Sequence, residues 1–240
     1  MDKASRKLKP LSYQENFSTA STVYLTNMSS HHIVRDEQEP ALLIAGFSAL
    51  QHEDIGQLLE WSPTVIAMEE SINDLITLGV KIDVAVVSAD RMKHWEETLR
   101  FQQPVQFLNA DGEKVSVIAG IIRHYLDKNY KTFHLLSNQL TLFDFINLCQ
   151  FFKYKAELVF INESQKITVH QVGTYKKWLK SGEGVSVFPL EEPTYLRTTG
   201  FRDNLDNDMI REEVRFTTAD EGLVTLETNL KPVLLAESLM

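Results

Sequence analysis

The stretch Thr64–Val87, TVIAMEESINDLITLGVKIDVAVV, holds two short apolar runs with a helical segment between them. The runs Thr64–Ala67 and Val84–Val87 are almost wholly apolar, which is typical of strands buried on both faces of a parallel sheet. Ser71 stands where it could cap a helix, and Gly79 stands where it could end one. The order strand, helix, strand predicts two parallel strands joined by a helical crossover.

The same alternation continues on both sides of this stretch. Further apolar runs lie at Ala41–Ala45, Pro104–Leu108, Phe133–Leu136 and Leu158–Ile161, and helical patterns lie at Glu53–Trp61, Ser71–Leu78, Met92–Leu99, Lys114–Tyr125 and Leu140–Phe152. Alternating strands and helices build an open sheet with helices against its faces. We therefore predict an α/β domain over residues 28–162, with a mainly parallel sheet and helices on both faces.

After about residue 163 the pattern changes to short, often alternating segments. These are Lys166–Gln171, Gly184–Phe188, Tyr195–Phe201, Val214–Thr218, Leu223–Glu227 and Pro232–Ala236, with turn signals such as Asp206-Asn207 between them. Such spacing is typical of antiparallel sandwiches and small barrels, and we predict an all-β sandwich domain over 163–240. Residues 1–27, rich in Ser, Thr, Asn and Lys, are predicted to be a poorly ordered leader, with Met28 as a candidate second start.

Composition limits the classes of function. The 240 residues include 24 Lys and Arg against 33 Asp and Glu, for a net charge of −9, which argues against a nucleic-acid-binding surface. No run approaches the ~18 apolar residues of a membrane helix, so no membrane partner is expected. The single cysteine, Cys149, favours a reducing, cytoplasmic compartment.

Acidic side chains collect where the predicted parallel strands end. They are Glu69, Asp90, Asp111 and Glu113. Ligands of open α/β sheets bind beyond the carboxyl ends of the strands, and Mg²⁺ prefers carboxylate oxygens together with a substrate phosphate. The same residue types are also favoured at the first turns of helices. The residues alone leave both interpretations open.

The stretch Trp61–Arg91 resembles the thiamin pyrophosphokinases, whose members carry a helix ending in Leu-Gly-Ile/Val-Lys-Pro-Asp before a strand. Leu78–Asp83 has the sequence LGVKID and matches that piece. Val185–Asn207, with VSVFPL and TTGFRDNLDN, resembles the family's β domain. The resemblance covers roughly residues 40–238. It implies pyrophosphate transfer from ATP to thiamine, with Mg²⁺ and ATP as cofactors, in a homodimer with its active site at the dimer interface.

The resemblance also assigns site residues. Asp90 stands at the second aspartate of the family's Gly-Asp-Phe-Asp-Ser loop and is the predicted catalytic residue and Mg²⁺ ligand. Glu69 stands at the aspartate of an Asp-Gly-Gly turn. The full set assigned to the cofactor is Gly46, Glu69, Arg91, Asp111 and Asp144. Other family positions are replaced, among them by Glu70, Ser88 and Val115.

Three functions stay open at this point. The first is the family reaction, with Asp90 as the retained metal ligand. The second is a catalytically impaired relative that binds a nucleotide, thiamine or another small metabolite, and the third is a dimeric scaffold. Pyrophosphoryl transfer depends on Mg²⁺ and on cationic groups that neutralise phosphate charge. The uncharged Ser88 and Val115 at two carboxylate positions therefore favour the second and third functions, whereas the architecture favours the first.

Overall fold

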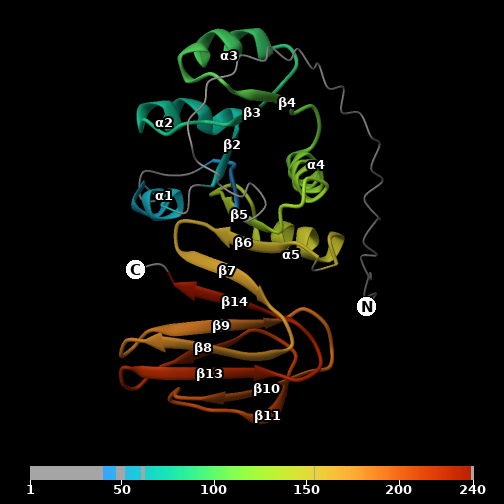
Figure 1. Cartoon of the computed structure of the whole chain (residues 1–240). Coiled ribbons are helices and arrows are strands. Elements are labelled where there is room, and N and C mark those ends of the chain that lie inside the picture. Colours follow the sequence, from blue (N-terminus) through green and yellow to red (C-terminus); the bar gives the residue numbers. More distant parts are fainter. Residues whose placement is uncertain (1–39, 47–51, 61–62, 154, 239–240) are drawn as a thin grey trace, which may run out of the picture.

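The computed structural model describes residues 40–46, 52–60, 63–153 and 155–238. The predicted leader at 1–27 lies outside these ranges. Within them the chain forms a ten-stranded sheet and a four-stranded sheet (Figure 1).

The N-terminal part of the large sheet is parallel. Its strands are β1 (Ala41–Ile44), β2 (Thr64–Met68), β3 (Val84–Val87), β4 (Gln106–Asn109), β5 (Thr132–Leu136) and β6 (Glu157–Ile161). They lie side by side in the order β6-β5-β1-β2-β3-β4. All six overlap the apolar runs of the sequence, because a strand covered on both faces needs apolar side chains on both. The edge strand β4 starts two residues after the beginning of its predicted run and is only partly buried.

Helices cover both faces of this parallel part, as predicted. On one face lie α1 (His52–Leu59), α2 (Ile72–Thr77) and α3 (Met92–Thr98), which contribute Ile55, Leu75 and Trp95 to one core cluster. On the other face lie α4 (Lys114–Leu126) and α5 (Leu142–Phe151), which contribute Ile118 and Phe145 to a second. Two short 3₁₀ turns, η2 (Glu69–Ser71) and η3 (Arg100–Gln102), complete the helical elements of the described ranges.

The C-terminal part forms the predicted sandwich. Strand β7 (Gln165–His170) pairs antiparallel with β6, and β14 (Val233–Ser238), β9 (Gly184–Pro189) and β12 (Val214–Thr217) extend the same sheet. The smaller sheet contains β8 (Gly173–Leu179), β10 (Thr194–Thr199), β11 (Asp206–Ile210) and β13 (Gly222–Thr228). A third core cluster, with Val187, Leu226 and Leu235 among its members, fills the space between the two sheets. One continuous sheet therefore passes from the α/β part into the sandwich.

Two strands of the sandwich were not predicted, and one predicted turn is wrong. Asp206-Asn207 begins β11, where Asn207 has φ +66° and is the extra residue of a bulge between Leu196 and Arg197 of β10. Four of the five residues of β11 are exposed, so the strand has no apolar alternation to reveal it. In strand β8 exposed and less exposed side chains alternate, but Lys177 occupies one of the less exposed positions, so the sequence shows no apolar alternation there.

No helix in the part of the chain that the structure describes is both long and apolar enough to cross a membrane.

Candidate functional site

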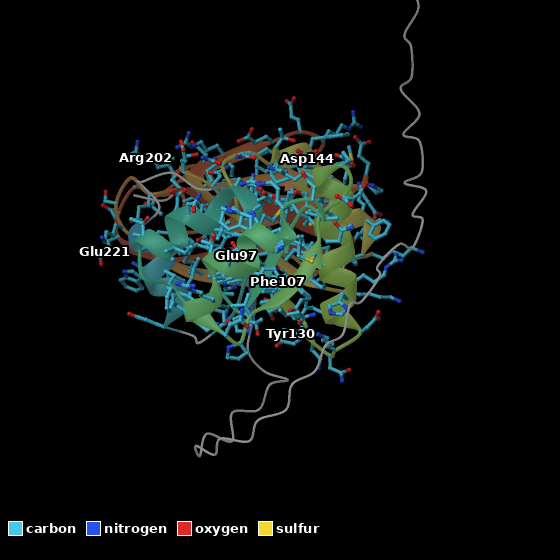
Figure 2. The ribbon with its side chains drawn as sticks, turned by 90° about the horizontal axis from the view of Figure 1, so that it is seen from above. Glu97, Phe107, Tyr130, Asp144, Arg202 and Glu221 are labelled. Atoms are coloured by element: carbon cyan, nitrogen blue, oxygen red, sulfur yellow. The ribbon has the colours of Figure 1, made fainter. Side chains whose placement is uncertain are left out.

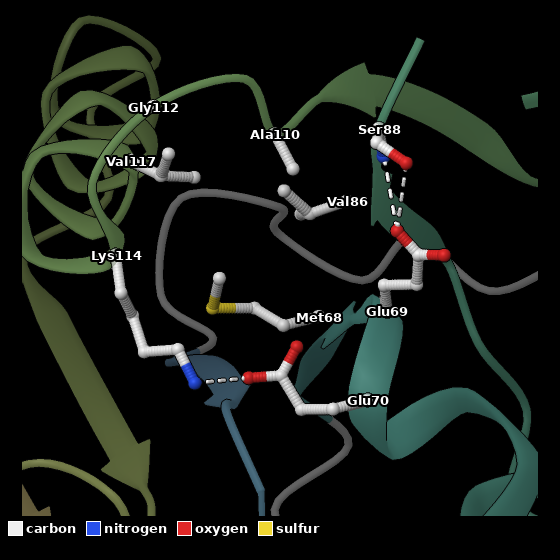
Figure 3. Close-up of a pocket in the computed structure, with 9 residues that line it drawn as sticks. All are labelled: Met68, Glu69, Glu70, Val86, Ser88, Ala110, Gly112, Lys114 and Val117. Carbon is white, nitrogen blue, oxygen red and sulfur yellow. Dashed lines mark hydrogen bonds and ion pairs between the residues drawn. The ribbon is translucent and has the colours of Figure 1, made fainter. Parts of the chain in front are cut away.

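A cavity of about 200 Å³ lies where β2, β3 and β4 end, next to the start of α4 (Figure 3). Its lining residues are Met68, Glu69, Glu70, Val86, Ser88, Ala110, Gly112, Lys114 and Val117. The carboxyl ends of parallel strands are where open α/β sheets bind ligands. The cavity is therefore the candidate site.

Glu69 is held by four hydrogen-bonding and charged contacts. One carboxylate oxygen, Oε2, accepts hydrogen bonds from the backbone N–H and the hydroxyl of Ser88, both at 3.1 Å. The other, Oε1, accepts a hydrogen bond from Trp95 Nε1 at 3.0 Å and lies 2.7 Å from the Arg91 guanidinium. Both oxygens are thus engaged by groups of the chain itself.

These contacts keep Glu69 ionised. Burial alone would raise the pKa of this carboxyl, but the hydrogen bonds from Trp95 and Ser88 and the charge of Arg91 outweigh burial, and the pKa is lowered from its usual 4.5. The side chain is only 18% exposed, so this small network is shielded from most of the solvent. Through these contacts Glu69 connects η2 to the end of β3, at Ser88, and to the start of α3, at Arg91 and Trp95.

Glu70 and Lys114 form a second ion pair across the cavity. Glu70 Oε1 lies 2.5 Å from Lys114 Nζ, which also donates to Gln139 Oε1. Figure 3 shows the lysine reaching from α4 toward Glu70 along one wall of the cavity. Lys114 was not predicted as a site residue, although its position at the start of a helix that follows a strand end was a usable signal.

Gly46 lies at the end of β1 in a buried polar network. Its N–H donates to Ser71 Oγ at 2.7 Å, and Ser137 Oγ donates to the Ala45 carbonyl at 2.7 Å. Ser71 stands at the N-cap position of α2, as predicted, but its hydroxyl makes no cap hydrogen bond to that helix and accepts the Gly46 N–H instead. Gly46 has φ +87°, and a Cβ on it would lie 2.8 Å from Gln139 Nε2. This position therefore favours glycine for both backbone and steric reasons.

The structure does not gather the predicted acidic residues into one cluster. Asp90 is exposed in the turn after β3 and does not line the cavity, and neither does its neighbour Arg91, which pairs with Glu69. Asp111 Oδ2 accepts a hydrogen bond from Asn109 Nδ2 at 2.9 Å and is also exposed. Of the predicted set, only Glu69 lines the cavity.

Asp144 has a structural role at the start of α5. It is the third helical residue and forms a capping box with Thr141, whose N–H and hydroxyl donate to Asp144 Oδ2 at 2.9 and 2.7 Å. Asp144 is not among the residues that line the cavity, and Figure 2 shows it toward the margin of the molecule.

Replacing Asp144 with alanine is expected to lower the free energy of unfolding by about 1 kcal/mol, as for other lost helix caps. Ligand affinity at the cavity should stay unchanged. Urea unfolding and ligand titration of the same variant measure the two effects separately. Lost ligand binding with unaltered stability would assign Asp144 to the site instead.

The side chains present do not fit a bound Mg²⁺. Within the described ranges, no three His, Cys, Asp or Glu side chains come together as a metal ion requires. Glu69 offers no free oxygen, Asp90 stands in the exposed turn, and Asp111 is engaged with Asn109. Mg²⁺ needs several oxygen ligands arranged as an octahedron, with protein carboxylates as its anchors. This donor set does not supply that anchorage.

These features define a class of protein: a mainly parallel α/β sheet that continues into a β-sandwich, with a small cavity at the strand ends. Solved structures with this architecture include several thiamin pyrophosphokinases. The enzyme from Geobacillus thermodenitrificans superimposes with a TM-score of 0.65 at 15% identity, over 83% of this chain and 97% of that one. The enzyme from Bacillus subtilis gives 0.65 at 13% identity, over 84% and 100%.

A eukaryotic structure agrees with the bacterial ones. The thiamin pyrophosphokinase from Candida albicans matches with a TM-score of 0.63 at 13% identity, over 91% of this chain and 96% of that one. No family model and no curated protein matches the sequence. The chain therefore has the fold of these thiamin pyrophosphokinases, as its sequence predicted.

Proposed function

We propose that this protein binds a small metabolite in the strand-end cavity and does not carry out the pyrophosphoryl transfer for which its structural relatives are named. The observation that supports this most directly is the state of Glu69. It stands at the aspartate of the family's Asp-Gly-Gly turn and is assigned to the cofactor by the resemblance, yet both its oxygens are engaged by Ser88, Trp95 and Arg91.

The charges around the cavity support the same proposal. Phosphoryl-transfer sites rely on metal ions and cationic side chains to neutralise the phosphates. Here Lys114, which lines the cavity, and Arg91, which contacts Glu69, are each paired with a glutamate. Each of these charges is thus already partly neutralised, which weakens the attraction that either cation can offer a triphosphate.

The cavity itself favours a binding protein over a scaffold. Apolar side chains, among them Met68, Val86 and Val117, form part of its wall, and polar groups from Glu70 and Lys114 reach its edge. Small-molecule sites usually combine such an apolar lining with a few polar groups. A scaffold that used only its outer surface would have no need of this arrangement.

Thiamine or a related heterocycle is the proposed ligand, because the structural relatives are thiamin pyrophosphokinases. A homodimer and a cytoplasmic location accompany the proposal, as the resemblance and the single cysteine suggest. The competing function is the family reaction itself, pyrophosphate transfer from ATP to thiamine. The family reaction consumes ATP and thiamine, whereas the proposed binding function involves no turnover of either.

Incubation with ATP, thiamine and Mg²⁺ is expected to yield no AMP above the level found with the Asp90→Asn variant. Thiamine should nevertheless stabilise the wild-type protein, by about 2.7 kcal/mol at a concentration 100 times the Kd. AMP is quantified by chromatography and stabilisation by thermal denaturation. The Bacillus subtilis enzyme serves as the active control.

AMP formation by the wild type that is lost in Asp90→Asn would overturn the proposal and restore the family reaction. Absence of both turnover and stabilisation, with thiamine and with ATP, would favour the scaffold.

A further inference from the structure

We infer that Glu70 sets the charge of the ligand, so that the cavity accepts a small body with a cationic N–H-donating group and rejects polyphosphates. This inference rests on the proposed function, because it treats the cavity as a ligand site. It adds the chemical class of the ligand and the residue that selects it.

The geometry of Glu70 supplies the first step. Its Oε1 is bound by Lys114, whereas its Oε2 has no hydrogen-bond donor among the described residues. Figure 3 shows this second oxygen directed into the cavity, on the side of Met68. The side chain is 30% exposed, so a ligand can reach it. An ionised carboxylate is an acceptor only, with about four lone-pair sites, and can hold a second donor beside Lys114.

The walls around that oxygen supply the second step. Met68, Val86, Ala110 and Val117 provide apolar surface, and Met68 is only 4% exposed. The volume of about 200 Å³ is below the ~300–1,000 Å³ of most drug-sized sites. The cavity therefore suits a small apolar body whose polar end meets Glu70, and it is too small to enclose a nucleoside triphosphate.

The surrounding charges supply the third step. Besides Glu69 and Glu70, exposed carboxylates of Asp90, Asp111 and Glu113 stand on the loops that follow β3 and β4. The cations of these loops and of the start of α4, Arg91 and Lys114, are already paired with the two glutamates. A negatively charged ligand would therefore approach a negative surface, whereas a cation would be attracted to it.

The methyl group of Met68 provides a reporter inside the cavity. The chain has six methionines, and Met209 of β11 is an internal reference on the far sheet. The full chain is labelled with ¹³C-methyl methionine, and Met68→Leu, a change that cores tolerate well, assigns the resonance. Three probes of one shape are titrated at low ionic strength: benzamidine as the cation, benzamide as the neutral form and benzoate as the anion.

Benzamidine should shift the Met68 resonance, and benzamide and benzoate should shift it far less or not at all. In Glu70→Gln the affinity for benzamidine should fall by about tenfold or more, the usual effect of losing a charge-assisted hydrogen bond. Lys114→Met should act in the opposite direction and tighten benzamidine by about fivefold, because it removes a competing cation. If Glu70 recognises the ligand, the two variants change benzamidine affinity in opposite directions. If the ion pair only supports the structure, both variants break it and should have similar effects.

Equal responses to benzamidine and benzoate, or unchanged benzamidine affinity in Glu70→Gln, would overturn the inference. Thiamine is titrated in the same samples to keep the two proposals apart. Thiamine binding that Glu70→Gln leaves unchanged contradicts this inference and retains the proposed function. Benzamidine binding that depends on Glu70, without any thiamine response, retains this inference and removes thiamine as the ligand. No Met68 shift with benzamidine or with thiamine contradicts both proposals.

Discussion

Replacing Gly200 with alanine is expected to lower the free energy of unfolding by about 3 kcal/mol or more, since backbone strain and overpacking each cost about 1–3 kcal/mol. Gly200 follows β10 with φ +84°. A Cβ there would lie 2.7 Å from the Leu223 carbonyl oxygen and 3.1 Å from Val224 Cα. Both atoms belong to the backbone of β13, so only a movement of that strand could relieve the contact. Urea unfolding measures the loss.

Gly182 offers a matched control. It has φ +82°, but a Cβ on it would meet no atom within 4 Å. Gly182→Ala should therefore show the conformational cost alone, about 1 kcal/mol. Equal losses in the two variants would mean that the close approach of β13 contributes nothing.

Replacing Glu69 with glutamine is expected to cost about 2–3 kcal/mol, the range for hydrogen bonds to a charged group. Glutamine keeps the shape, but its NH₂ group would face donors from Ser88 or from Trp95 and Arg91. Glu70→Gln is the control, because Glu70 is more exposed and has one partner for its charge. That variant should lose about 1 kcal/mol or less.

The loss in Glu69→Gln should depend on pH. The pKa of Glu69 is lowered in the folded protein, so its contribution is complete above the ordinary value of 4.5 and disappears as the pH falls through the lowered folded value. Denaturant unfolding of both proteins between neutral and acidic pH measures this. A difference in stability that stays constant into the acid range would show that the charge of Glu69 is not responsible.

The fold was largely predictable because its strongest constraint is visible in the sequence. Strands buried on both faces are mostly apolar, and all six strands of the parallel part overlap the apolar runs of the sequence, although the edge strand β4 is only partly buried. Strands with one solvent-facing side leave a weaker signal. Strand β11 is almost entirely exposed, and β8 directs Lys177 toward Glu237 where an apolar residue would be usual. Both were missed for that reason.

The site was predicted less well, because sequence position does not determine which partners a side chain finds. Glu69 was placed at the strand ends correctly, but its four contacts come from residues about twenty to twenty-six positions further along the chain. Asp144 stands at a family position and forms a helix cap, a role that its spacing from Thr141 already allowed. Lys114 has no counterpart in the family motifs that the sequence resembles, and its pairing with Glu70, 44 residues away, depends on the fold.

The unbroken sheet has a consequence for how the molecule can move and unfold. Because β6 and β7 are hydrogen-bonded neighbours, the chain passes between its two parts through a tight strand reversal and not through a flexible tether. The two parts cannot swing about a hinge as separately folded bodies, and a break in either part would leave the other with a bare strand edge. The described chain should accordingly unfold as a single cooperative unit, in which destabilising one part of the sheet also destabilises the other.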